Sequence, residues 1–209
     1  KAFSREQCMP SKSKQSREAI FWEWFQANED RLFNFEREQE KVFSELMREL
    51  HRIHKSLTFE FSSVQENKRQ FVISADGHRE AFPAVIKLGD AAPDLPRWQF
   101  IKFRPRRSDS CTVGIGNVMI SSDEVEFTLE PEGRKVSITL FLGDAKYFDE
   151  RTFGHIAFLL LDHTLGEYDV ETFIGRVDFK PRDAISTLEK RPLQDLPAVF
   201  DRFVQSLRN

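Results

Sequence analysis

The 209-residue chain has too few cysteines to build a disulfide framework or a multi-thiolate metal site, because Cys8 and Cys111 are its only two. It also lacks an uninterrupted apolar run of the roughly 18 residues that a membrane-spanning helix needs. The net charge of -3 is too small to favour nucleic acid or an anionic membrane as an obligate partner. These absences predict a protein of a reducing, cytoplasmic compartment with no membrane partner.

Short motifs that identify common chemistries are missing as well. The chain has no serine or cysteine nucleophile elbow. Gly114 and Gly116 resemble part of a phosphate-binding loop, but the further glycine and the lysine of such a loop are missing. We therefore expect no cofactor.

Phenylalanine, in contrast, is abundant, with 21 in the chain. Each aromatic ring buries a large apolar area. The composition therefore predicts a core in which aromatic rings take the place of leucine.

The first quarter of the chain predicts a tail followed by a helical arm. Residues 1–16 are polar and rich in serine and lysine, which predicts a tail. Residues 17–55 form the arm, because apolar residues recur with a helical period from Arg17 to Phe35 and again from Phe43 to Ile53. Two helices are expected there.

The rest of the chain predicts two copies of a strand-strand-helix-strand (ββαβ) unit. The copies occupy residues 56–107 and 118–182, a linker at 108–117 separates them, and residues 183–209 contain a C-terminal helix. Internal duplication is favoured by the similar strings that end the two units. These strings are Phe103-Arg104-Pro105-Arg106 and Phe179-Lys180-Pro181-Arg182.

The order of these elements gives the fold class. Strands joined by a helix run parallel and hairpin strands run antiparallel. We therefore expect an α+β protein in which two tandem ββαβ units form a ferredoxin-like mixed sheet with helices packed on it, in one compact body. Whether the two units share a sheet is left open by the sequence.

The second unit contains an acidic, histidine-bearing corner, where a helix predicted for Glu150 to Leu165 meets a strand predicted for Val170 to Phe179. The candidate catalytic residues are Asp162, His163, Glu167 and Asp169. Imidazole and carboxylate groups are suitable ligands for zinc or iron, which would make the chain a metal-dependent hydrolase. Alternatively, the histidine suits the negative end of a helix dipole, the acidic residues face solvent, and no metal is bound.

A second set of candidates is suited to binding. Arginine forks recognise phosphate or carboxylate, so the basic stretch around Arg104 predicts contact with RNA or phosphate, or with the chain's own acidic corner. Two tryptophans two positions apart do not share a helix face, which predicts one that is exposed to a partner or a second copy. The candidate binding residues are Arg104, Arg106, Arg107, Trp22, Trp24 and Tyr168.

Three strings resemble a group of uncharacterised bacterial proteins. They are Phe21-Trp22-Glu23-Trp24-Phe25, the stretch from Phe71 to Gly77 (FVISADG) and the stretch from Leu161 to Glu171 (LDHTLGEYDVE). The resemblance implies a bacterial, cytoplasmic origin and assigns no catalytic residue.

The leading hypothesis is a non-enzymatic binding or regulatory module that contacts another protein or a second copy of itself. The alternatives are the metal-dependent hydrolase and, third, RNA or phosphate binding through the arginines. The absence of a catalytic motif, the duplicated ββαβ unit and the tryptophan-bearing helical arm are the reasons for this order.

Overall fold

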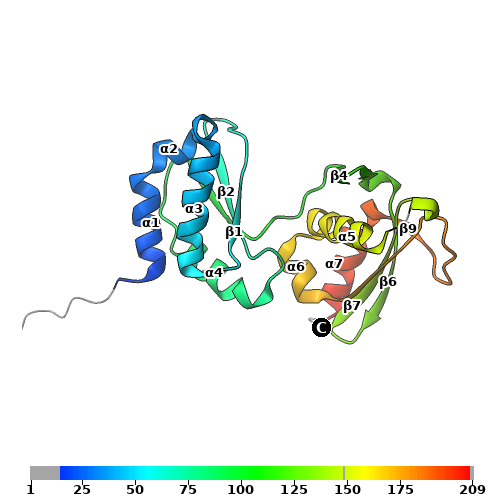
Figure 1. Cartoon of the computed structure of the whole chain (residues 1–209). Helices are drawn as coiled ribbons and strands as arrows, with labels where there is room; N and C mark the ends of the chain where they lie inside the picture. Colours follow the sequence, from blue (N-terminus) through cyan, green and yellow to red (C-terminus); the bar gives the residue numbers. More distant parts are fainter. Residues whose placement is uncertain (1–14, 148, 208–209) are drawn as a thin grey trace, which may run out of the picture.

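The computed structural model describes residues 15–147 and 149–207, which form two lobes joined by an extended segment (Figure 1). We call residues 17–104 the N-terminal lobe and residues 112–207 the C-terminal lobe. The tail predicted for residues 1–16 lies almost wholly outside the described residues.

The N-terminal lobe is built from helices packed on a three-stranded sheet. Its helices are α1 (Arg17–Ala27), α2 (Glu29–Phe33), α3 (Gln39–Ile53) and α4 (Phe82–Asp90). Its strands are β1 (Thr58–Phe61), β2 (Arg69–Ser74) and β3 (Trp98–Lys102). The sheet has the order β1-β2-β3, with β1 antiparallel and β3 parallel to the central β2.

The single helix expected from Arg17 to Phe35 is interrupted at Asn28. The Asn28 backbone leaves the helical region, and its side-chain amide donates to the carbonyl oxygen of Trp24 at 2.8 Å. A side chain that satisfies a terminal carbonyl in this way ends a helix. A short second helix, α2, then turns the chain toward α3.

Aromatic rings fill the core of the N-terminal lobe, as the composition predicts. Phe71, at the centre of β2, has ring centroids of Phe25 at 5.4 Å, Phe61 at 5.3 Å and Phe100 at 6.1 Å around it. In the C-terminal lobe, by contrast, the buried cluster consists mainly of leucine, isoleucine and valine. The prediction of an aromatic core therefore holds for one lobe only.

The C-terminal lobe contains a four-stranded sheet of order β8-β7-β6-β9, in which β7 is antiparallel to β6 and parallel to β8. Its strands are β4 (Thr112–Ile115), β5 (Val118–Ser121), β6 (Glu126–Glu132), β7 (Lys135–Phe141), β8 (Ile174–Lys180) and β9 (Arg191–Pro192). Its helices are α5 (Glu150–Leu165), α6 (Glu167–Phe173) and α7 (Leu196–Ser206).

Two local predictions in this lobe are wrong. The linker expected at 108–117 contains β4, which forms a separate antiparallel hairpin with β5. The strand expected from Val170 begins only at Ile174, because Gly166, with φ 82° and ψ 147°, ends α5 and the chain starts α6 at the next residue. Only glycine adopts this backbone conformation without large strain.

The two lobes have separate sheets and separate buried clusters, whereas we expected one compact body. In each lobe the two strands joined by helices are direct neighbours. A ferredoxin-like, split βαβ arrangement would place another strand between them. The fold is therefore α+β with two mixed sheets, one in each lobe.

Within residues 15–147 and 149–207, the helices are all too short or too polar to cross a bilayer.

Candidate functional site at the junction of the two lobes

The residues singled out in the acidic corner and the basic stretch meet where the two lobes touch. Because β2 and β3 are parallel, their carboxyl ends lie at the same edge of the sheet. Ala75 follows β2 there, and Arg104 follows β3. Helix α6 of the other lobe lies beside this edge (Figure 1). We call this contact region the junction.

Glu167, the first residue of α6, is the most buried charged residue of the junction, with an exposed fraction of 0%. Its Oε1 accepts hydrogen bonds from the backbone amides of Ala75 at 2.8 Å and Gly77 at 3.4 Å. Its Oε2 accepts from the backbone amide of Arg104 at 3.1 Å. The Glu167 amide in turn donates to the Arg104 carbonyl oxygen at 3.1 Å. One residue of the C-terminal lobe thus closes both strand ends of the N-terminal lobe.

Left-handed backbone conformations turn these amides toward Glu167. The φ angles are 51° at Asp76, 74° at Gly77 and 65° at Phe103. Successive backbone amides in such conformations form concave sites for anions. A phenylalanine with positive φ is uncommon, so its presence beside Arg104 shows how strongly this corner is constrained.

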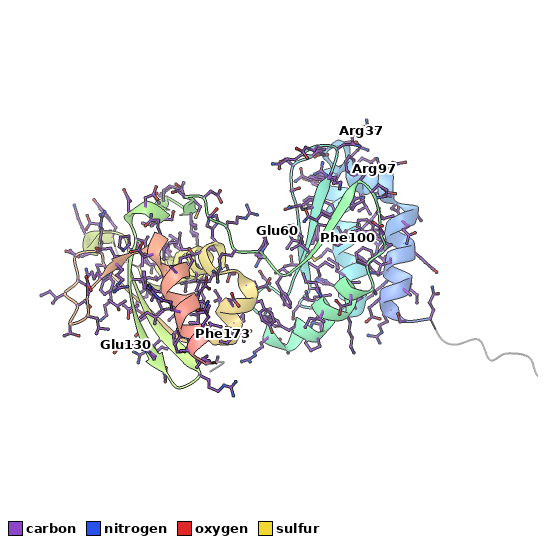
Figure 2. All side chains as sticks on the ribbon, turned by 180° about the vertical axis from the view of Figure 1, so that it is seen from behind. Arg37, Glu60, Arg97, Phe100, Glu130 and Phe173 are labelled. Atoms are coloured by element: carbon purple, nitrogen blue, oxygen red, sulfur yellow. The ribbon has the colours of Figure 1, made fainter. Side chains whose placement is uncertain are left out.

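The Arg104 guanidinium lies against three carboxylates. It contacts Glu60 at 2.6 Å and Asp76 at 3.0 Å, and its Nη1 lies 3.9 Å from Asp162. Glu60 is on the side of the N-terminal lobe that faces the connecting segment (Figure 2). Arg104 therefore offsets negative charge that both lobes bring to the junction.

Asp162, near the end of α5, has an unusual protonation equilibrium. Burial raises the pKa of Asp162 from 3.8 to about 7; the Arg104 guanidinium opposes this shift, and the carboxylates of Glu167, Glu171 and Asp76 add to it. Burial and Glu167 also raise the pKa of Glu171. A carboxyl of this kind exchanges its proton near neutral pH, so the charge balance of the junction changes there.

Arg106 holds the connecting segment against the C-terminal lobe. Its guanidinium makes a forked contact with Asp201 of α7, at 3.0 Å to each carboxylate oxygen, and reaches Asp169 of α6 at 3.1 Å. Its Nε donates to the Leu165 carbonyl oxygen at 3.3 Å. The segment that begins at Arg106 therefore packs against the C-terminal lobe.

Tyr168 adds an aromatic contact beside Glu167. Its ring centroid lies 5.7 Å from that of Phe82 and 5.3 Å from that of Phe103, and these two phenylalanine rings are 4.5 Å apart. The tyrosine ring is half-exposed. It covers one side of the junction with apolar surface.

The four candidate catalytic residues do not converge on one cleft. Asp162 faces Arg104, Glu167 is held by backbone amides, and Asp169 pairs with Arg106. His163 points elsewhere, with Nε2 2.8 Å from the Asp109 carbonyl oxygen in a separate cavity of about 140 Å³. In the part of the chain that the structure describes, no three histidine, cysteine, aspartate or glutamate side chains are placed to hold a metal ion.

The remaining binding candidates lie in different places. Trp22 is a core residue whose Nε1 donates to the Leu88 carbonyl oxygen at 2.9 Å. Trp24 is half-buried at the edge of the same core, 6.1 Å from Phe21 between ring centroids. Arg107 is half-exposed, with its Nη2 3.9 Å from the carboxylate of Glu60.

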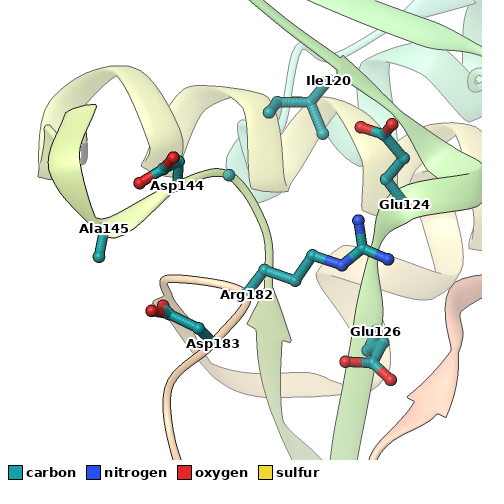
Figure 3. Close-up of a pocket in the computed structure, with 8 residues that line it drawn as sticks. Ile120, Glu124, Glu126, Asp144, Ala145, Arg182 and Asp183 are labelled. Carbon is teal, nitrogen blue, oxygen red and sulfur yellow. The ribbon is translucent and has the colours of Figure 1, made fainter.

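Two larger cavities are lined by residues other than Glu167 and its amide donors. One, of about 880 Å³, is lined by Arg107, Lys68, Gln70 and Gln99 among others. The other, of about 700 Å³, lies in the C-terminal lobe, where Arg182 is surrounded by the carboxylates of Glu124, Glu126, Asp144 and Asp183 (Figure 3). The first is lined mainly by polar surface, whereas the second has more apolar than polar lining.

Sequence reasoning missed the groups that bind Glu167, because they are backbone amides. The one available signal is the Asp76-Gly77 pair, which is typical of a turn at the end of a strand. The partners Glu60 and Asp201 were missed as well, since each lies far along the chain from the arginine it contacts.

Comparison with models of protein families, with curated proteins and with solved structures gave no significant match to this chain. The site's chemistry therefore rests on its own geometry.

Proposed function

We propose that this protein is a non-enzymatic, two-lobed binding module that contacts a protein partner. The proposal rests on the contacts that the charged junction residues make. The carboxylates and arginines that would serve catalysis or phosphate binding are instead engaged with one another and with backbone amides. The junction fixes the relative orientation of the two lobes, and the partner contacts a different surface of the protein.

The contact surface we favour is the outer face of α5. Phe158 and Leu159 are 46% and 47% exposed, although the opposite face of the helix packs against the lobe's core. Their positions relative to His155 and Asp162 place all four residues on one helix face. Large apolar side chains on a rigid helix, with polar residues around them, are typical of the centre of a protein interface.

The test is a pull-down that compares the proteins bound by variants of the full chain. A Phe158→Ser, Leu159→Ser double variant removes the apolar pair, and Ile185→Ser is the matched control, because Ile185 is 94% exposed but stands outside α5. We expect one protein, or a second copy detected by light scattering, to associate with the wild type and the control but not with the double variant. A monomer whose recovered proteins are the same for all three chains would contradict the proposal.

The metal-dependent hydrolase remains the rival class, and elemental analysis of the purified protein separates the two. About one equivalent of zinc or iron, lost in an Asp162→Asn, His163→Ala variant, would favour the rival. The RNA or phosphate hypothesis is weakened, because Arg104 and Arg106 are both paired with carboxylates.

The origin of the two lobes belongs to the same proposal. Each lobe contains a hairpin, a helical crossover and a parallel third strand in the same order. This supports an internal duplication of a ββαβ unit. A bacterial, cytoplasmic origin, implied by the resemblance of the three strings, is proposed with it.

A further inference from the structure

We propose that the N-terminal lobe contains a carboxylate-binding niche, formed by the backbone amides of Ala75, Gly77 and Arg104, and that Glu167 is its tethered, exchangeable ligand. When the lobes separate, the niche is free to bind a carboxylate from another molecule. This inference does not depend on the partner surface proposed for α5.

The position of the niche is the first argument. In sheets with parallel strands connected by helices, ligands bind in the crevice beyond the carboxyl ends of the strands. Ala75 and Arg104 stand at those ends of β2 and β3. The place where a ligand is expected is thus occupied by a side chain from the other lobe.

The donors are arranged for a carboxylate. Two amides point at one oxygen of Glu167 and a third points at the other, at distances of 2.8 to 3.4 Å. The left-handed conformations of Asp76, Gly77 and Phe103 keep this arrangement in the backbone itself. It does not depend on side-chain rotamers, so the N-terminal lobe keeps it when Glu167 leaves.

The charges around the niche select the class of anion. The Arg104 guanidinium is close enough to Glu167 for their charges to interact and favours a negative ligand. Glu60 and Asp76, which stay with the N-terminal lobe, already pair with this guanidinium at 2.6 and 3.0 Å and oppose additional negative charge. A monoanionic carboxylate is therefore favoured over a phosphate dianion.

Exchange is feasible because the lobes are separately built. Each has its own sheet and its own buried cluster. Arg106 ties the connecting segment to the C-terminal lobe. Separation therefore requires release of the contacts of Glu167, Tyr168 and Arg104 and of the 3.9 Å pair between Arg107 and Glu60, and neither buried cluster is shared between the lobes.

Acetate is the probe for the niche, and the test uses the full chain. In Glu167→Ala the side-chain carboxylate is gone and the three amides remain. Titration with sodium acetate, against sodium chloride at equal ionic strength, is followed by the amide resonances of Ala75, Gly77 and Arg104 in ¹H–¹⁵N spectra. We expect saturable shifts in Glu167→Ala and none in the wild type over the same range, because the tethered carboxylate has a high effective concentration.

Glu171→Ala is the matched control, since it removes a neighbouring carboxylate and leaves Glu167 in place; it should behave like the wild type. The niche is refuted if acetate shifts no amide of Glu167→Ala saturably, or if it shifts them equally in all three chains.

Sodium phosphate is the second probe, and tighter binding of phosphate than of acetate would overturn the carboxylate assignment. If Glu167→Ala requires refolding, a higher yield in acetate than in chloride supports the niche, and equal yields contradict it.

Discussion

The Glu167 carboxylate accepts a hydrogen bond from the Ala75 backbone amide at 2.8 Å, although 92 residues separate the two along the chain. Ala75 ends the central strand of one lobe and Glu167 begins a helix of the other. Through this contact a fully buried acidic side chain is satisfied by backbone donors across the junction.

Glu167→Gln should destabilise the N-terminal lobe by about 2–4 kcal/mol. The side-chain NH₂ of glutamine would face a backbone N–H group, and it cannot accept a hydrogen bond from that group. The three tryptophans, Trp22, Trp24 and Trp98, all lie in this lobe, so their fluorescence during urea unfolding reports its stability. Glu23→Gln, at an exposed position of α1, is the control. Equal unfolding midpoints for the two variants would show that the contact contributes little.

Asp162 should make the protein less stable as the pH rises from about 4 to about 7. Below pH 4 its carboxyl is protonated in the folded and unfolded chain alike. Between these values the unfolded chain releases the proton while the folded protein keeps it, since the folded pKa is about 7, so the free energy of unfolding falls.

The Asp162→Asn variant should lose this component. Relative to wild type, its free energy of unfolding should rise by about 2–4 kcal/mol between pH 4 and pH 8. Urea unfolding at five pH values measures the difference, with Asp94→Asn, an exposed aspartate outside the junction, as the control. Parallel pH profiles for the wild type and Asp162→Asn would disprove the prediction.

Gly166→Ala should separate the connecting segment from α6. A Cβ at this position would lie 3.0 Å from the Arg106 amide nitrogen and 3.2 Å from the Arg104 carbonyl oxygen, and φ is 82°. Gly133→Ala is the matched control, with φ 61° and open space around its Cβ. We expect a loss of about 1 kcal/mol for the control, from the left-handed conformation alone, and a clearly larger loss for Gly166→Ala. Equal losses by thermal unfolding would mean that the close approach is readily relieved.

Arg106→Lys should weaken the C-terminal side of the junction. Lysine cannot reproduce the forked contact with Asp201 while also reaching Asp169. A loss of about 1 kcal/mol is expected from these partly exposed contacts. Arg107→Lys, whose arginine makes only a 3.9 Å contact with Glu60, should be close to neutral. The opposite order of the two variants in thermal unfolding would contradict the assignment.

Features that depend on local periodicity could be predicted from the sequence. The helical period from Phe43 to Ile53 and the helix predicted from Glu150 to Leu165 correspond to α3 and α5, because each helix displays its pattern within its own segment. The strand expected from Val170 was wrong, since its valine, threonine and phenylalanine residues favour a strand locally. Tertiary contacts of Glu167 and Tyr168 place this segment in α6 instead.

The junction could be predicted only in part. Contact between the basic stretch and the acidic corner was one of the alternatives drawn from charge, and the pairs of Arg104 with Asp162 and of Arg106 with Asp169 correspond to it. The binding of Glu167 by backbone amides could not be foreseen. It depends on φ angles at Asp76 and Phe103, and residue types alone do not specify them.

The most direct test of the account measures the distance between the lobes with and without the Glu167 carboxylate. With Cys8 and Cys111 replaced by serine, spin labels at Val64 and Ile185, both exposed, report this distance by pulsed electron paramagnetic resonance. We predict a narrow distance distribution for the chain with Glu167 and a broad one for Glu167→Ala, with tryptophan fluorescence confirming that the N-terminal lobe is folded. The same narrow distribution in both chains would contradict the claim that Glu167 holds the lobes together.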